Sequence, residues 1–214
     1  ITACLAMLRE ASIDLKGYAA GTLACLSGAG RQEAIAAAGG IDGLMRILSE
    51  GGRGSVYKRE AARAVCSLAE AQATHAAMAA GGLGPLITLA SGSAEGDAQK
   101  YALQALHKLS AGGNVEAIEA LASSSETTGL LVKQLGGGTM EERVAAVRSL
   151  RQLVGSRGSK TAEAREAVVA SGGVASLVKL SKAADIGAEA KAEAAFAIAA
   201  LADPPHTEAV AASG

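Results

Sequence analysis

Residues 61–69 have the sequence Ala61-Ala-Arg-Ala-Val-Cys-Ser-Leu-Ala69, and this pattern recurs along the chain without gaps. Residues 19–27 and 194–202 align with it directly, and residues 102–110 and 146–154 share its register. The leucine near the end of each copy stands at position 26, 68, 109, 153 or 201, so successive copies are 42, 41, 44 and 48 residues apart. A period of this length is typical of a solenoid, in which small helical units stack and share a core.

A pair of adjacent glycines marks a second fixed position in three of these units. We expect each pair to form a sharp turn, because glycine has no Cβ and adopts backbone conformations that other residues avoid. Apolar residues spaced three and four apart precede and follow each pair, which predicts a short helix before the turn and another helix after it. The turn glycines are Gly39, Gly40, Gly81, Gly82, Gly172 and Gly173.

Each unit is therefore predicted to contain three helices: a first helix that ends at the glycine pair, a second helix, and a longer third helix that carries the alanine-rich pattern. No segment alternates polar and apolar residues as a strand would, so we predict an all-α chain. We expect a section of a longer protein, because the array is incomplete at both ends. One repeat array is predicted over residues 1–214, with units at 1–29 (partial), 31–71, 73–112, 114–158, 160–204 and 206–214 (partial).

The pattern resembles the armadillo repeat. The resemblance rests on residues 38–48, where Ala-Gly-Gly-Ile is followed by leucine and isoleucine at helical spacing, and on residues 58–69. HEAT repeats are the nearest alternative, but they have two helices and no Gly-Gly turn. The resemblance implies a right-handed α-solenoid of about five repeats, whose third helices line a concave groove that holds extended segments of partner proteins. It also implies a protein without enzymatic activity.

In armadillo proteins such as importin-alpha and beta-catenin, this groove carries a ladder of asparagines, and importin-alpha has tryptophans one turn earlier. This chain lacks the ladder, so we do not expect it to bind nuclear localisation signals as importin-alpha does. At the asparagine position the chain has Cys25, Ser67, Lys108, Gln152 and Ala200. At the tryptophan position it has Gly21, Arg63, Gln104, Arg148 and Phe196.

Basic side chains recur instead along one face of the third helices, at positions i, i+4 and i+8. We predict that this stripe binds an acidic or phosphorylated segment of a partner protein through arginine forks. Acidic residues fall more often in first helices and loops, which favours a cationic groove between acidic edges. An ordinary solvated helix face is the alternative, because Glu60, Glu141 and Glu142 are close by in the sequence. The predicted groove residues are Arg59, Arg63, Ser67, Lys100, Gln104, Lys108, Arg148 and Gln152.

Two other functions stay open. The first is a structural subunit held in a larger assembly through its edges or ends, which a hydrophobic content of 50% supports. The second, which we favour less, is nucleic-acid binding by the basic stripe, since the net charge of −1 and the aromatic content of 2% offer little bulk attraction or base stacking. Residues 123–129 and 155–161 lengthen two connections, and we expect surface loops that either carry recognition or are neutral insertions.

No catalytic, metal or cofactor site is predicted, and no small-molecule substrate. The three histidines are far apart in the sequence, and residues 155–161 lack the glycine that precedes the lysine of a phosphate loop. His75 stands where other units have Glu33 and Glu208, so we predict that it lies on the surface. Three cysteines without a CxxC motif favour a reducing, cytoplasmic compartment, with the nucleus or an organelle as open alternatives. The Ala-, Gly- and Arg-rich composition favours a eukaryotic origin. No apolar run reaches the about 18 residues of a membrane span.

Overall fold

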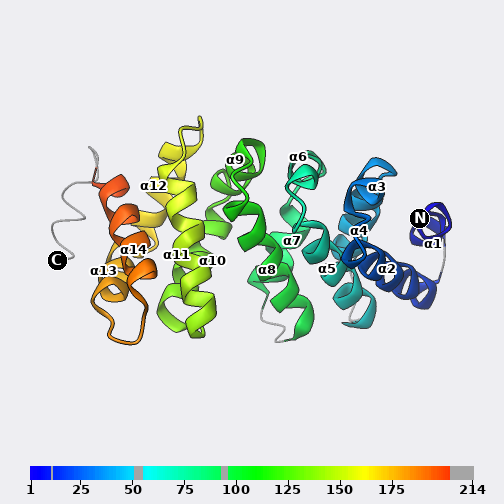
Figure 1. Cartoon of the computed structure of the whole chain (residues 1–214), viewed down its shortest axis with the longest axis horizontal. Helices are drawn as coiled ribbons and strands as arrows, with labels where there is room; N and C mark the ends of the chain where they lie inside the picture. The colour runs from blue at the N-terminus through cyan, green and yellow to red at the C-terminus, as the bar shows by residue number, and fades with distance from the viewer. Residues whose placement is uncertain (11, 51–54, 93–95, 203–214) are drawn as a thin grey trace. The chain divides into compact units, whose positions relative to one another are not determined.

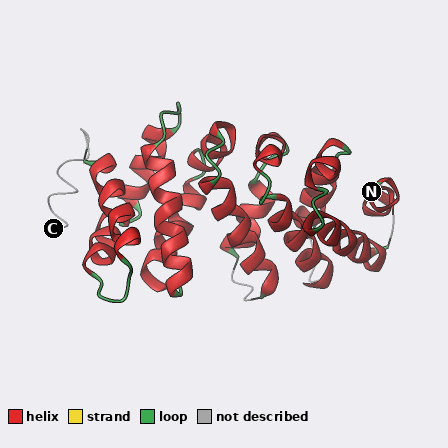
Figure 2. Cartoon of the chain, in the orientation of Figure 1, coloured by secondary structure: helices red, strands yellow, loops and turns green. Residues whose placement is uncertain are grey.

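The computed structural model describes residues 1–10, 12–50, 55–92 and 96–202. These residues form fourteen α-helices and one 3-10 turn, and none of them is in a strand (Figure 2). They belong to two compact units, Ile1–Ala117 and Ile118–Gly214. The partial repeat predicted at residues 206–214 lies outside the described residues.

Unit 1 starts with one pair of helices and continues with two sets of three (Figure 1). In each set a short first helix leads into a second helix and then into a longer third helix. The helices are α1 (Thr2–Glu10), α2 (Ile13–Gly28), α3 (Gln32–Ala37), α4 (Gly40–Ser49), α5 (Ser55–Leu68), the 3-10 turn η1 (Gln72–Thr74), α6 (His75–Ala80), α7 (Gly84–Ser91) and α8 (Asp97–Ala111).

Unit 2 repeats the three-helix arrangement twice, and its boundary with unit 1 lies inside α9. The three-helix organisation and the all-α class that the sequence predicts are therefore confirmed for the described residues. The limits of the individual repeats, and one array over residues 1–214, stay predictions. The helices are α9 (Val115–Ala122), α10 (Ser125–Gly137), α11 (Met140–Gly155), α12 (Thr161–Ala170), α13 (Gly173–Lys182) and α14 (Ala188–Leu201).

In the pairs Gly39–Gly40 and Gly172–Gly173, the turn between first and second helices depends on two different properties of glycine. Gly39 and Gly172 have φ angles of 78° and 75°, in the left-handed region that side chains with a Cβ rarely adopt. The next residue, Gly40 or Gly173, starts the second helix and is fully surrounded. A Cβ at either position would collide with the last turn of the preceding helix. One glycine therefore sets the direction of the chain, and the other lets two helices approach closely.

The core consists of small and branched apolar residues. The repeated leucine of the third helices is fully buried at Leu68, Leu109, Leu153 and Leu201, whereas Leu26 in the first pair of helices is half-buried. Third helices pack side by side within each unit, α5 against both α2 and α8, and α11 against α14. The buried alanines of the repeated pattern make this close packing possible, because their side chains occupy little space between the helices.

The prediction of an extended surface loop at residues 123–129 is wrong for most of that segment. Helix α10 begins at Ser125, and the hydroxyl of Ser124 caps it by accepting a hydrogen bond from the Thr127 backbone N–H at 3.2 Å. Thr127 and Thr128 are buried. A serine cap thus replaces the glycine pair at the start of this second helix, and the polar residues after it belong to the first turn of α10.

The other lengthened connection is a loop over residues 156–160. The Glu119 side chain of α9 holds it, because the Ser159 backbone N–H donates a hydrogen bond to Glu119 Oε1 at 2.8 Å. The hydroxyls of Ser156 and Thr161 are also 2.8 Å apart, which ties the end of α11 to the start of α12. This insertion therefore has fixed local contacts within unit 2.

The prediction that His75 lies on the surface is wrong. Its side chain is 2% exposed, and Nε2 lies 2.9 Å from the Ala69 carbonyl oxygen. The imidazole packs against Gly112, where any side chain would overlap the ring. The glutamate at the same position of an earlier repeat, Glu33, is exposed, so the burial of His75 comes from this local pairing with a glycine in the following connection.

Replacing Gln134 with leucine is expected to raise the free energy of unfolding by about 1–2 kcal/mol. Gln134 is 7% exposed, and neither its Oε1 nor its Nε2 has a hydrogen-bond partner in the described part of the chain. Other second helices have a buried apolar residue at the equivalent position, Ile47 in α4 and Leu180 in α13. Each of these residues comes three positions after a buried leucine, as Gln134 comes three positions after Leu131. Leucine would bury a similar volume without the unpaired amide. Urea unfolding followed by circular dichroism measures the change.

The matched control for this prediction is Lys133→Leu, because Lys133 is exposed on the same helix, α10. We expect this second variant to stay within about 0.5 kcal/mol of the parent protein. A loss of stability on Gln134→Leu would contradict the prediction and would mean that the buried amide is satisfied.

Candidate functional site

The predicted groove residues lie on third helices in both units. Unit 1 contributes six of them from α5 and α8, and unit 2 contributes Arg148 and Gln152 from α11. Spacing of four residues places each helix's members on one face. Arg59 and Arg148 have side chains about half exposed, at 44% and 45%, and those of Arg63 and Lys108 are 36% and 33% exposed. The cationic ends are therefore within reach of solvent.

Glu60 pairs with both arginines of α5. Arg63 donates from Nη2 and Nε to Glu60 Oε2 at 2.6 and 2.9 Å, and Arg59 donates to Glu60 Oε1 at 3.1 and 3.2 Å. Burial, the largest single influence, acts to raise the pKa of Glu60, but the hydrogen bonds and charges of Arg63 and Arg59 outweigh it and lower the pKa. The hydrogen bond to Glu60 is the main cause that raises the pKa of Arg63. Glu60 and Arg63 therefore both stay charged at neutral pH.

Lys108 connects α8 to α5. Its Nζ lies 2.8 Å from Glu70 Oε1, 3.2 Å from the Cys66 carbonyl oxygen and 3.3 Å from Cys66 Sγ. Burial acts to lower the pKa of Lys108, but Glu70 and Cys66 together raise it. Burial raises the pKa of the Cys66 thiol, so the thiol keeps its proton and lies 3.6 Å from Gln104 Oε1 as a weak donor. Lys108 is therefore an interhelical contact with a charged end at the surface.

Lys100 differs from its neighbours in the stripe. Its side chain is exposed on α8 and forms no ion pair or hydrogen bond with any residue that the structure describes. Ser67, the third stripe position of α5, is half-buried. Across α5 and α8 together, five lysines and arginines stand against two acidic residues. This pair of helices consequently carries a positive excess.

The third helices of unit 2 have a different charge pattern. Arginines of α11 pair with acidic residues on α14 or just before it, in three successive rungs. The rungs are Arg143 with Asp185 at 2.9 Å, Arg148 with Glu189 at 2.8 Å, and Arg151 with Glu193 at 3.0 Å. Across α11 and α14, four basic residues stand against four acidic ones. The expected basic stripe is thus neutralised here by the neighbouring helix.

Phe196 of α14 is the single Phe, Tyr or Trp residue in the sequence of unit 2. It is 61% exposed, and the guanidinium carbon of Arg151 lies 5.7 Å from the ring centroid. The sequence places Phe196 at the tryptophan position of the importin-alpha ladder, but Arg151 is not among the predicted groove residues. The sequence does contain a signal for Arg151: an acidic residue stands about one repeat later. Each of the three ion pairs joins residues 41 or 42 positions apart.

Within residues 1–10, 12–50, 55–92 and 96–202, no group of three or more His, Cys, Asp or Glu side chains is placed to hold a metal ion. No described helix has both the length and the apolar character that crossing a membrane requires. The free thiols are Cys4, Cys25 and Cys66.

Known structures resemble the chain over its whole length. A computationally designed armadillo repeat protein for modular peptide recognition matches it with a TM-score of 0.81 and 21% identity, covering 100% of this chain and 87% of that one. A designed armadillo repeat protein in complex with peptide (KR)4 matches with a TM-score of 0.76, 23% identity and the same coverage. An engineered protein matches with a TM-score of 0.75 and 29% identity, covering 100% of this chain and 84% of that one.

No protein-family model and no curated relative matches the sequence. The structural likeness nevertheless shows the fold: the chain has an all-α fold of the armadillo solenoid class. The armadillo resemblance that the sequence carries is thereby confirmed at the level of the fold.

Proposed function

We propose that this chain is a non-catalytic interaction scaffold that binds an extended, acidic or phosphorylated segment of a partner protein along α5 and α8 of unit 1. The fold supports a binding role, because similar designed armadillo proteins are made for peptide recognition, and one was solved with the basic peptide (KR)4. The charge of this chain's own helices favours a peptide of the opposite sign.

The observation that carries the proposal is the positive excess on α5 and α8, five basic residues against two acidic ones. Glu60 is shared by Arg59 and Arg63, so each guanidinium keeps N–H groups that are free to meet a second anion. Lys100 has a whole ammonium group available. A carboxylate or phosphate held between α5 and α8 would face arginine forks, which bind such groups in a bidentate manner.

The proposal assigns the peptide to unit 1 because the third helices of unit 2 are balanced. Arg143, Arg148 and Arg151 already have carboxylate partners one repeat away. An acidic peptide would have to displace these carboxylates. The displaced carboxylates would then be unpaired and close to the negative charges of the peptide. Ion-pair exchange of this kind yields little net affinity.

Reversing two charges in unit 1 is expected to weaken binding of the acidic peptide (DE)4 about tenfold. The variant combines Arg59→Glu with Lys100→Glu, which removes two accessible cations and spares the Arg63–Glu60 and Lys108–Glu70 pairs. Fluorescence anisotropy with a labelled peptide measures the affinity, and added salt should weaken it further, since exposed charges are screened. A phosphoserine at the centre of the peptide should increase the affinity.

Arg31→Glu is the matched control, because Arg31 is exposed at the start of α3, outside the third helices. We expect its affinity for (DE)4 to stay within about twofold of that of the parent protein. Equal binding of (DE)4 by the parent and the double variant would contradict the proposed site. Tighter binding of a single-stranded oligonucleotide than of any acidic peptide would contradict the proposed class of partner.

A further inference from the structure

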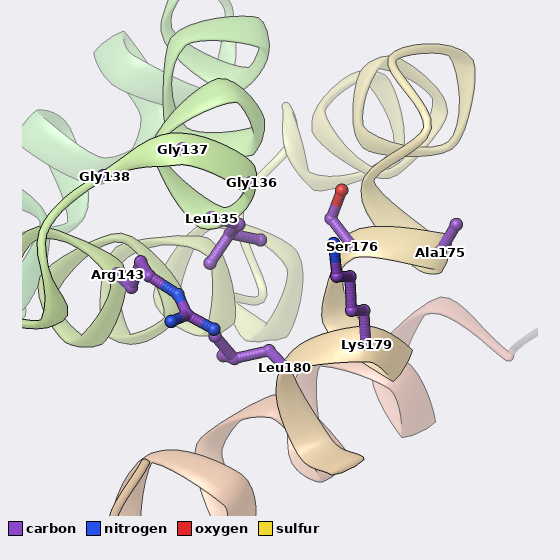
Figure 3. Close-up of a pocket in the computed structure, with 9 residues that line it drawn as sticks. All are labelled: Leu135, Gly136, Gly137, Gly138, Arg143, Ala175, Ser176, Lys179 and Leu180. Carbon is purple, nitrogen blue, oxygen red and sulfur yellow. The ribbon is translucent and has the colours of Figure 1, made fainter. Parts of the chain in front are cut away.

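Unit 2 contains a pocket of about 520 Å³ between the end of α10, the start of α11 and one face of α13. This volume is within the range of pockets that hold small organic ligands. Figure 3 shows Arg143 extending from α11 toward α13, with Lys179 and Ser176 on the facing helix. The residues that line the pocket are Leu135, Gly136, Gly137, Gly138, Arg143, Ala175, Ser176, Lys179 and Leu180.

The space exists because α10 ends in glycines. A Cβ at Gly136 or Gly137 would meet no atom within 4 Å, so these positions leave room that a side chain would occupy. In α4, the two residues that follow the matching Leu48 are Ser49 and Glu50. Close packing therefore does not explain Gly136 and Gly137. Their effect is that no side chain fills the pocket from this side.

The charged groups of the pocket are not fully paired. Arg143 Nη1 donates to Asp185 Oδ2 at 2.9 Å, but Arg143 Nε is buried and has no hydrogen-bond partner in the described part of the chain. The Lys179 side chain is exposed and forms no ion pair or hydrogen bond with any described residue. A buried donor without an acceptor is unfavourable, because it has lost its hydrogen bonds to water.

The balance of charge selects the sign of a ligand. Two full positive charges face the pocket, and Asp185 offsets one of them from an exposed position. The carbonyl end of α10 adds a partial negative charge, which is smaller than the charge that remains on Lys179. An anion is therefore favoured over a cation or a neutral molecule. Exposed Ala175 and the edges of the buried Leu135 and Leu180 supply a small apolar surface beside the two cations.

We propose that this pocket binds a small organic anion, with a phosphate or carboxylate head held by the Arg143 guanidinium and Lys179 Nζ and a compact apolar body against Ala175 and the adjoining edges of Leu135 and Leu180. The inference is independent of the proposed peptide site, because its residues belong to α10, α11 and α13 and none lies on α5 or α8. It assigns a ligand site to a fold whose proposed function is to bind proteins.

Phenyl phosphate and benzoate are the two probes, one for each head group, and NMR titration of the ¹⁵N-labelled chain is the measurement. We expect at least one probe to bind saturably at millimolar concentration or below. The backbone amides of Gly136–Gly138 and the Nε–H signal of Arg143 should shift together. Absence of any saturable shift with both probes would overturn the proposal. Equal binding of inorganic phosphate would also overturn it, because that result means an adventitious ion only.

Three variants separate the pocket from general surface charge. Lys179→Gln should weaken binding about tenfold, since it removes a charged hydrogen bond. Gly136→Leu should abolish binding by filling the pocket, and the fold should tolerate the change because leucine is a better helix former than glycine. Lys133→Gln, which removes an exposed charge from the same α10 helix, should stay within twofold. Unchanged binding by Lys179→Gln or Gly136→Leu would contradict the assignment.

Discussion

The Gly173→Ala variant is expected to lose about 3 kcal/mol of unfolding free energy. Gly173 starts α13 directly after the turn, and a Cβ there would lie 2.5 Å from Val168 Cγ1 and 2.7 Å from the Val168 carbonyl oxygen. It would also lie 3.0 Å from Val132 Cγ2. The carbonyl belongs to the last turns of α12, so the collision cannot be relieved by rotating a side chain. The helices must separate, and the core around Val168 loses its packing.

Gly129→Ala provides the matched control, because Gly129 is a helical glycine in α10 where an added methyl group would meet no atom within 4 Å. There the substitution should raise the unfolding free energy by about 0.5–1 kcal/mol, through helix propensity alone. Urea unfolding of both variants, followed by circular dichroism, measures the difference. Equal stability of the two variants would show that α12 and α13 do not approach as closely as described.

The Gly112→Ala variant is expected to lose about 2 kcal/mol of unfolding free energy in unit 1. A Cβ at Gly112 would overlap Cε1 of the His75 ring and lie 2.5 Å from Nδ1. The ring is 2% exposed and is held by the contact between Nε2 and the Ala69 carbonyl oxygen. The ring can move aside only by breaking that contact. The loss of stability therefore includes both the steric clash and the lost polar contact.

A double-mutant cycle makes this prediction specific to the pair. His75→Ala alone leaves a cavity, which an alanine methyl at position 112 can partly fill. We therefore expect His75→Ala with Gly112→Ala to lose at least about 1 kcal/mol less than the sum of the two single changes. Gly84→Ala, at an open position of α7, is the control and should be close to neutral. Strict additivity of the two changes would contradict the contact.

The repeat period predicts the parts of the fold that depend on pattern alone. The leucines at 68, 109, 153 and 201 are all buried, because identical positions in stacked units face the same core. The glycine pairs likewise mark where first helices end. These features depend on glycine positions and on the spacing of apolar residues, and both can be read directly from the sequence.

The incorrect predictions concern contacts that depend on individual side chains. Comparison with Glu33 places His75 on the surface, but the burial of the ring depends on Gly112, a residue in the next connection. The polar character of residues 125–129 predicts a loop, yet the hydroxyl of Ser124 starts a helix there. Residue type alone does not show whether a polar group finds a local partner.

The charge pattern of the candidate site is predictable only in part. The cations of α5, α8 and α11 lie on third helices, as the spacing indicates. Their partners could not be assigned from position, because pairing depends on how far each side chain reaches toward the adjacent helix. Arg148 pairs with Glu189, and Lys108 pairs with Glu70, in each case from one repeat to the next. The balance of α11 and α14 thus emerges only from the packed helices.

The links between neighbouring third helices have a consequence for how the chain folds. The hydrogen bonds that Arg63, Gln104, Lys108 and Arg148 make across these helices join residues 38 to 42 positions apart. Each link closes a loop of nearly the same length, so the entropic penalty is nearly equal for every added repeat. Within each unit, folding is then a series of similar nearest-neighbour steps that can start at more than one repeat.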